Sequence, residues 1–157
     1  MKVKLIIIGK TKSKFLIEGE NEYQRRLKHY CKFSELIIPD IKNGGKLSKK
    51  ELKEKEGNLI LESIKNNNYV VLLDDKGLTL SSTEFAEFFN KKMVSSTNEL
   101  VFVVGGAFGF SESVYKRANT KLSLSKMTFS HQMVRLIFKE QLYRAFTILK
   151  GEKYHHE

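Results

Sequence analysis

The sequence contains little cysteine and proline and no tryptophan. Cys31 is the only cysteine among 157 residues, so the chain can form neither an internal disulfide nor a cluster of cysteine metal ligands. The N-terminal apolar run at residues 5–8 is far too short for a signal-peptide core or a membrane span, and no other run approaches either length. We therefore expect a soluble, unprocessed protein of the reducing cytoplasm.

The motifs of several enzyme classes are also missing from the sequence. It has no HExxH spacing, no nucleophile triad motif and no cluster of metal-ligating residues, so a hydrolase or a metalloenzyme has no support. Hydrophobic residues make up 41% of the chain and no tract is of low complexity, which is typical of a folded globular protein.

Positive charge is in excess. The chain has 28 Lys and Arg residues against 18 Asp and Glu residues, which gives a formal net charge of +10. Such an excess attracts polyanions and binds phosphates through the release of counterions, so nucleic acid is the leading class of partner. The alternative is that the lysines only keep the surface soluble.

Short apolar runs alternate with segments of helical spacing. Residues 3–8, 36–38, 69–73, 100–104 and 122–124 predict five strands, and residues 15–30, 48–64, 81–93, 111–118 and 131–149 predict five helices. Continuous apolar strands suit a parallel sheet with helices on both faces, so we expect a Rossmann-like α/β fold in one domain over residues 1–157. Ligands of such a sheet bind at the carboxyl ends of its strands.

The last predicted helix, residues 131–149, is apolar around most of its circumference. A helix of this kind is buried in a large core or shared with a second subunit, and a chain of this length has limited core to offer. The pattern predicts a homodimer through this helix. A central helix buried within a monomer is the alternative.

Two loops after strands attract attention. Residues 74–77 (Asp-Asp-Lys-Gly) are predicted to form an ordinary turn. Residues 105–109 (Gly-Gly-Ala-Phe-Gly) place glycines after a strand, where backbone N–H groups can approach a ligand. This loop has no Lys-Ser/Thr ending and comes too late for a dinucleotide fingerprint, which weakens both phosphate-binding interpretations. A ligand loop and a tight turn that needs positive φ are equal alternatives.

A third segment, residues 123–131, mixes hydroxyl and apolar side chains and runs directly into the last helix. Such a segment can hold a flat, partly apolar ligand by backbone hydrogen bonds and side-chain walls. The helix carries Arg135, Lys139 and Arg144, whose spacing predicts a polar side where phosphate could bind. His131 stands at the helix start, where the dipole favours a neutral imidazole; a capping or packing histidine is the alternative.

The chain ends with an aromatic ring and two imidazoles after a glycine stop at Gly151. Tyr154, His155 and His156 could stack on a base or contact phosphate. A frayed terminus without a role is the alternative.

Taken together, these motifs resemble the RlmH family, the smallest branch of the SPOUT methyltransferases. The similarity extends from residues 3–9 through Glu22-Tyr23-x-x-Arg26 to the C-terminus and so covers the whole chain. The motifs that carry it are Leu73-Asp74, Gly105-Gly106-x-x-Gly109, residues 122–129 (Leu-Ser-Leu-Ser-Lys-Met-Thr-Phe), residues 131–135 (His-Gln-Met-Val-Arg), residues 140–145 (Glu-Gln-Leu-Tyr-Arg-Ala) and Tyr154-His155.

The resemblance implies a C-terminal trefoil knot, an obligate homodimer, and transfer of a methyl group from S-adenosylmethionine to N3 of a pseudouridine in the 23S ribosomal RNA of the large subunit. It implies that the cofactor is held by Leu73, Gly105, Leu124, Ser125, Lys126, Met127, Thr128 and Phe129. RNA contacts are expected from His131, Arg135, Arg144, Tyr154, His155 and His156, and the proton acceptor is sought among His131, Tyr154 and His155.

The sequence departs from the family pattern at three places. Ser130 stands where relatives often have proline, Ala107 and Phe108 replace more polar residues, and His156 replaces a basic residue. A non-catalytic basic RNA-binding domain would explain the charge but not the glycine loop. A nicotinamide-dependent oxidoreductase would need a glycine fingerprint after the first strand, where the chain has only Gly9.

Overall fold

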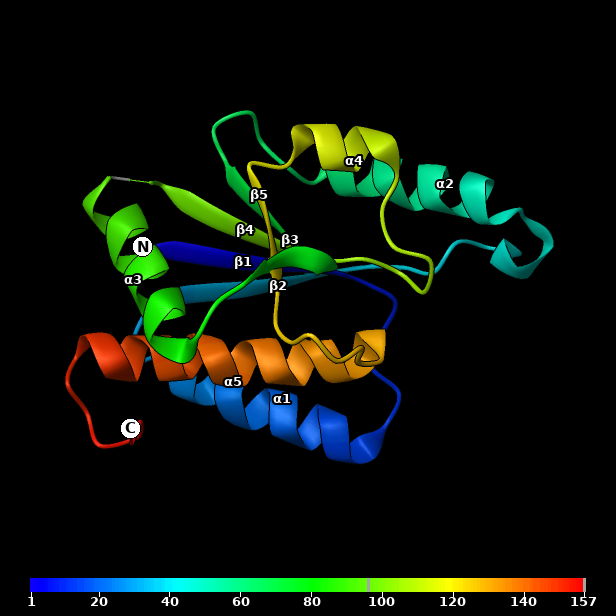
Figure 1. Cartoon of the computed structure of the whole chain (residues 1–157). Coiled ribbons are helices and arrows are strands. Elements are labelled where there is room, and N and C mark those ends of the chain that lie inside the picture. Colours follow the sequence, from blue (N-terminus) through cyan, green and yellow to red (C-terminus); the bar gives the residue numbers. More distant parts are fainter. Residues whose placement is uncertain (96, 157) are drawn as a thin grey trace.

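The computed structural model describes residues 1–95 and 97–156 (Figure 1). All the predicted strands and helices are present. Most of their ends lie within a few residues of the predicted bounds. In chain order the elements are β1 (Lys2–Ile8), α1 (Lys14–Leu27), β2 (Lys32–Ile38), a 3-10 helix η1 (Gly44–Lys46), α2 (Lys49–Glu62), β3 (Tyr69–Thr79), α3 (Ser82–Val94), β4 (Glu99–Val104), α4 (Glu112–Arg117), β5 (Thr120–Ser123) and α5 (His131–Leu149).

The strands form one sheet in the order β2-β1-β4-β3-β5, and every neighbouring pair is parallel. The central strands are apolar because both faces of the sheet are covered: Leu100, Val101, Phe102 and Val103 of β4 are all fully buried. This confirms the predicted α/β sheet. The trefoil knot and the single-domain boundary at residues 1–157 stay predictions.

Helices cover the sheet in two layers (Figure 1). Helices α1, α3 and α5 lie on one face, and α2 and α4 lie on the other. The first interface is rich in aromatic rings, including Phe102 and Phe138, whose centroids are 4.7 Å apart. The second is mostly aliphatic and includes Ile6, Ile60 and Val103. No helix in the described part of the chain combines the length and apolarity needed to cross a membrane.

Helix boundaries follow local signals in the sequence. At the start of α3, the Ser81 hydroxyl accepts the backbone N–H of Glu84, and the Glu84 carboxylate accepts the backbone N–H of Ser81, which together form a capping box. At the predicted glycine stop, Gly151 has φ +66° just after α5, and its N–H donates to the carbonyl of Ile148. The prediction of this stop is confirmed.

Helix α5 is apolar nearly all round because the sheet, α1 and α3 surround it (Figure 1). The large exposed apolar side chains of the described residues lie on other segments and include Phe15, Ile17, Phe108 and Met127. The apolar circumference of α5 is therefore largely covered within the chain, and the predicted homodimer needs other support.

The prediction for residues 74–77 is wrong. Strand β3 runs through them to Thr79, and its register against β5 shifts between Leu73 and Leu78. Pairing with β4 ends at Leu73, so the extension depends on β5, a strand far away in the sequence. A Cβ at Gly77 would lie 2.7 Å from the Leu122 backbone, which explains the glycine at this close approach.

Candidate functional site

A cavity of about 540 Å³ lies at the carboxyl ends of β4 and β5, beside the point where β3 stops pairing with β4. Its walls come from residues 73–76, from the glycine loop at residues 104–110, from residues 122–125 and 127–131, and from Tyr115 and Val134. This volume is within the usual range of about 300–1,000 Å³ for small-molecule sites. The cavity therefore occupies the edge of the sheet where the sequence predicts a ligand.

The glycine loop needs its glycines for packing and for its turn. A Cβ at Gly105 would lie 3.1 Å from the ring of Phe110, and one at Gly106 would lie 2.6 Å from the Glu56 carboxylate. Gly109 has φ +82°, and the space beside its Cα is open. The loop is a tight turn and it lines the cavity, and binding of a ligand by it stays a prediction.

Serine hydroxyls shape the loop between β5 and α5. Ser123 Oγ donates to the carbonyl of Ser125 at 2.7 Å, and Ser125 Oγ accepts the backbone N–H of Met127 at 2.9 Å. Ser130 Oγ caps α5 by accepting the N–H of Met133 at 3.2 Å. These local bonds fix the backbone that forms one wall of the cavity.

The residues that the family resemblance assigns to the cofactor come together in space. Lys126 is exposed and does not line the cavity. The others all line it: Leu73, Gly105, Leu124, Ser125, Met127, Thr128 and Phe129.

Sequence reasoning missed a polar pair in the cavity wall. The Tyr115 hydroxyl, from α4, donates to Asp74 Oδ2 at 2.5 Å. Burial opposes ionisation of Asp74, but this bond and the backbone N–H of Lys76 outweigh it, so the pKa of Asp74 lies below its ordinary value. Burial and Asp74 raise the pKa of Tyr115. The cavity therefore has an ionised carboxylate and a neutral phenol at neutral pH.

His131 lines the cavity at the first turn of α5. Burial lowers the pKa of its imidazole, and the positive charge of Arg135 lowers it further. The imidazole is therefore neutral at neutral pH and able to accept a proton.

Arg135 is fully buried, which corrects the expectation that it contacts RNA. Its guanidinium donates to the carbonyls of Ile8 at 2.6 Å and Gly9 at 3.0 Å, and to the Thr11 hydroxyl at 3.0 Å. Lys139 is 1% exposed and pairs with Glu20 at 2.7 Å. These cations bind groups inside the fold, so no phosphate reaches them in this structure.

Lys139 also pairs with Glu35 at 2.6 Å, so one buried ammonium joins α1, α5 and β2. Thr11 extends the network, because its hydroxyl donates to Glu20 at 2.6 Å. The chain of contacts continues to Arg135, one turn from His131. We conclude that these side chains hold the first turns of α5 against the sheet and thereby position one wall of the cavity.

The C-terminal residues pack on α5 and α1, away from the cavity. The Tyr154 hydroxyl lies 3.1 Å from both the Tyr23 hydroxyl and Glu140 Oε1, and the Arg144 guanidinium lies over the Tyr154 ring at 4.8 Å. His155 Nδ1 is 3.4 Å from Arg144. Burial, Tyr23 and Glu140 raise the pKa of Tyr154.

None of the expected C-terminal site residues, Arg144, Tyr154, His155 and His156, lines the cavity of its own chain. Among the candidates for the proton acceptor, His131 alone does so. In the described part of the chain no three His, Cys, Asp or Glu side chains lie close enough together to hold a metal ion.

Comparisons with known proteins identify the family of this chain. A family model described as "Predicted SPOUT methyltransferase" matches residues 1–155. Proteins named Ribosomal RNA large subunit methyltransferase H are 57% identical in Parabacteroides distasonis, over 100% of both chains, and 56% identical in Christiangramia forsetii, over 99% of both. A solved structure of a probable methylase family protein from Haemophilus influenzae Rd KW20 has a TM-score of 0.56 at 14% identity, covering 99% of this chain and 70% of that one, and supports the fold alone. The chain therefore belongs to the SPOUT methyltransferases and, within them, to the RlmH family.

Proposed function

We propose that this cytoplasmic protein transfers a methyl group from S-adenosylmethionine to N3 of a pseudouridine in the 23S ribosomal RNA of the large subunit. The observation that carries the proposal is the cavity, because it is built from the segments that the family resemblance assigns to the cofactor. The names of the relatives support ribosomal RNA as the substrate class.

The residues of the cavity fit this cofactor. Apolar side chains such as Leu73, Leu122 and Leu124 offer a surface for a flat base, and the glycine loop allows close approach of the backbone. The Asp74 carboxylate, kept ionised by Tyr115, supplies negative charge suited to a cationic donor. When bound, S-adenosylmethionine supplies an electrophilic methyl group through its sulfonium.

The chain's own residues then have two tasks, alignment and removal of one proton. Alignment falls to the walls of the cavity, whose loops are fixed by the serine hydrogen bonds and by the buried network under α5. We assign proton acceptance from the pseudouridine N3 to the neutral imidazole of His131, since it lines the cavity and its pKa is lowered by burial.

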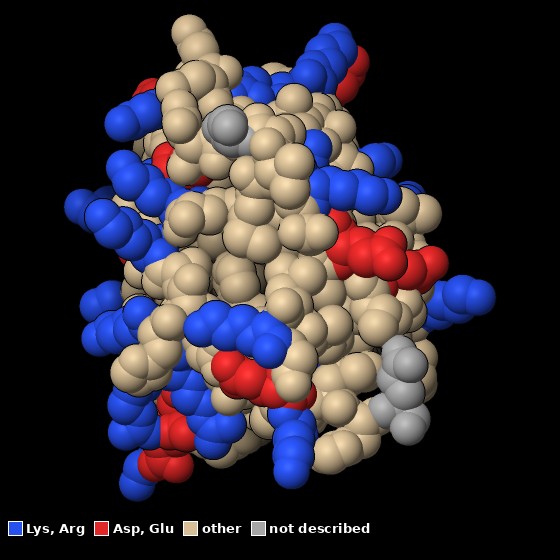
Figure 2. Space-filling view, turned by 90° about the vertical axis from the view of Figure 1, so that its left-hand side faces the viewer, with Lys and Arg blue, Asp and Glu red and all other residues tan. Residues whose placement is uncertain are grey.

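Charge alone does not locate the RNA-binding surface. Figure 2 shows the face with the amino ends of the strands, opposite the cavity, and lysine and arginine side chains gather around its margin. The net charge of +10 favours approach to RNA in general. Selection of the target must come from groups near the cavity mouth.

A homodimer would explain the C-terminal residues. Tyr154 contacts Glu140 and Tyr23, whereas the cavity reaches along α5 only as far as Val134, six residues or about 9 Å away along the helix axis. The last residues therefore reach a cavity most directly if it belongs to a second chain packed across a two-fold axis. Phe15 of α1 is 63% exposed and supplies apolar surface for such packing.

A mixing experiment tests this shared site. Thr128→Trp fills the cavity, and deletion of residues 154–157 removes the tail; each variant should be inactive alone. Mixed and allowed to exchange subunits, they should regain activity, because a mixed dimer has one intact cavity facing one intact tail. A tail that acts on its own cavity would give no recovery, and monomers in sedimentation at micromolar concentration would exclude the dimer.

Methyl incorporation tests the function itself. The protein should transfer labelled methyl groups from S-adenosylmethionine to large ribosomal subunits or assembled ribosomes, and digestion should recover the label in N3-methylpseudouridine. Thr128→Trp should abolish transfer, whereas Lys126→Trp, in the same loop but outside the cavity, should retain it. Binding of RNA without any methyl transfer would instead support the non-catalytic RNA-binding alternative.

A further inference from the structure

An aromatic side chain stands exposed at the cavity. Phe108, between Gly106 and Gly109 in the glycine loop, lines the cavity and is 47% exposed. Its neighbour Ala107 is exposed as well. The next phenylalanine along the chain, Phe110, is buried and supports Gly105 from below, so packing of the loop is the role of Phe110 rather than Phe108.

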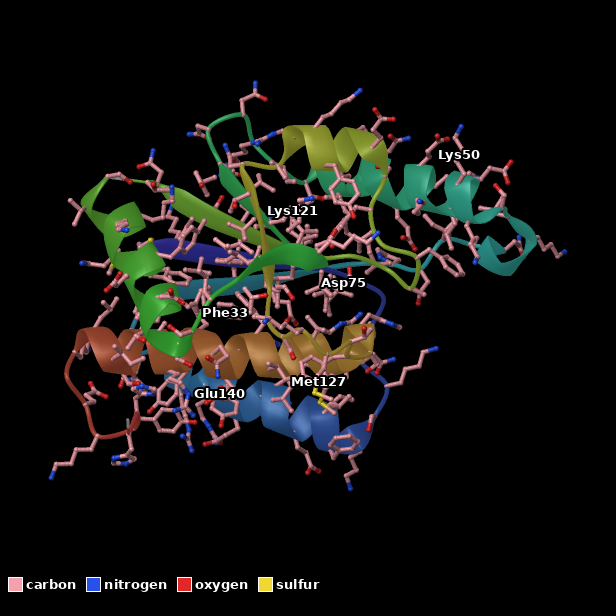
Figure 3. All side chains as sticks on the ribbon, viewed as in Figure 1. Phe33, Lys50, Asp75, Lys121, Met127 and Glu140 are labelled. Carbon is pink, nitrogen blue, oxygen red and sulfur yellow. The ribbon has the colours of Figure 1, made fainter. Side chains whose placement is uncertain are left out.

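A lysine accompanies the ring of Phe108. Lys49, at the first turn of α2, places its ammonium 5.1 Å from the ring centroid. Lys49 itself is exposed, as is its neighbour Lys50, labelled in Figure 3 at the same end of α2. Positive charge therefore adjoins an apolar face that opens to solvent beside the cavity.

The loop before α5 contributes a second exposed apolar side chain to the same cavity. Met127, labelled in Figure 3, is 75% exposed and lines the cavity from the side of α5. The cavity thus has exposed apolar groups from two loops, although its interior already has its own apolar walls. Met127 is among the residues that the family resemblance assigns to the cofactor, whereas Phe108 is not.

We infer that Phe108 is a stacking platform for an unpaired base of the substrate RNA, with Lys49 contacting an adjacent phosphate. This inference rests on the proposed function, since methylation at N3 requires a pseudouridine whose pairing edge is free, and hence RNA with bases out of the helical stack. The expected partner is a single-stranded stretch of the RNA that flanks the target.

The chemistry of the pair matches that partner. An aromatic face binds any base by stacking, and an ammonium beside it meets the phosphate that links consecutive nucleotides. Because Phe108 adjoins the cavity, a base stacked on it would be close in sequence to the base that enters. The platform would therefore help to hold the RNA while the target base is presented to the donor.

Substitutions of Phe108 separate stacking from simple apolar cover. The dissociation constant for large ribosomal subunits should rise about tenfold in Phe108→Ala and by a similar factor in Phe108→Leu, which keeps apolar bulk without a ring. Phe108→Tyr should stay within about twofold of the parent. The calorimetric affinity for S-adenosylmethionine and the thermal midpoint should not change in any of the three.

Lys49→Met tests the phosphate contact. It should weaken binding of the subunits and reduce the slope of log K against log salt by about one. Lys91→Met, on an exposed position of α3, is the matched control and should leave RNA affinity close to that of the parent.

Three results would overturn the inference. The first is an RNA affinity of Phe108→Ala equal to that of the parent, and the second is an RNA affinity of Phe108→Leu equal to that of the parent. The third is a loss of S-adenosylmethionine affinity in parallel with the loss of RNA affinity, which would mean that the ring packs on the donor. Failure of the proposed function is a separate outcome, because it would appear as absence of methyl transfer by the parent protein, whereas the affinities for the subunits can be compared without turnover.

Discussion

Replacing Arg135 with methionine tests whether this residue braces the fold or binds RNA. Methionine keeps the apolar stem but removes the guanidinium, leaving the carbonyls of Ile8 and Gly9 and the Thr11 hydroxyl without their donor. Those groups belong to the end of β1 and the loop after it, which α5 contacts again where Gln132 accepts the N–H of Lys12 at 3.0 Å. The substitution should therefore loosen the junction between β1 and α5.

The expected magnitude follows from the burial of Arg135. Its side chain is 0% exposed, and each of the three acceptors that it leaves without a donor costs at least about 1 kcal/mol, so the free energy of unfolding should fall by about 3–5 kcal/mol. For a chain of this size Tm falls by about 2–4 °C per kcal/mol, so this loss of free energy corresponds to a drop in Tm of roughly 6–20 °C. Lys126→Met, at an exposed position, should change stability by less than about 0.5 kcal/mol.

Urea denaturation at one protein concentration, combined with salt titrations of RNA binding, measures both effects. A fixed concentration is needed because a dimer makes apparent stability depend on it. We expect Arg135→Met to be strongly destabilised. At temperatures where it is folded, its RNA affinity should depend on salt with the same slope of log K against log salt as that of the parent protein. Parental stability with a salt slope reduced by about one would refute the brace and restore Arg135 as a phosphate contact.

Three further outcomes are expected. Because the pKa of His131 is lowered, the rate of methyl transfer should fall only below about pH 6.5, and His131→Gln should remove this fall in acid. A pH profile of the rate in His131→Gln equal to that of the parent would exclude His131 as proton acceptor. Tyr115→Phe should reduce the free energy of unfolding at pH 7 by about 0.5–1 kcal/mol, and the difference should vanish in acid as Asp74, whose pKa is lowered, becomes protonated; a difference independent of pH would contradict this. Deletion of residues 154–157 should abolish transfer and lower Tm by only a few degrees, since it removes the bonds of Tyr154 but no buried core; parental turnover would reject a catalytic role for the tail.

Local patterns in the sequence were enough to predict most of the secondary structure, although not the extension of β3 through residues 74–77. Helix caps such as Ser81 with Glu84, and apolar runs such as residues 100–104, depend mainly on neighbouring residues. Loops after strands also predicted the cavity, because the carboxyl ends of parallel strands meet at one edge of the sheet.

Features that depend on distant partners were missed. Arginine is usually found at the surface, and the burial of Arg135 is possible only because the carbonyls of Ile8 and Gly9 accept hydrogen bonds from it. Tyr115 reaches Asp74 only because α4 and the extension of β3 flank the same cavity. No spacing in the sequence indicates either contact.

The most direct test of the account is a calorimetric titration of the protein with S-adenosylmethionine, S-adenosylhomocysteine and NAD in parallel. We expect the first two to bind and NAD not to bind. Thr128→Trp should lose this binding, and Lys126→Trp should keep it, with both variants folded. Absence of S-adenosylmethionine binding to the parent protein, or unchanged binding to Thr128→Trp, would contradict the assignment of the cavity as the cofactor site.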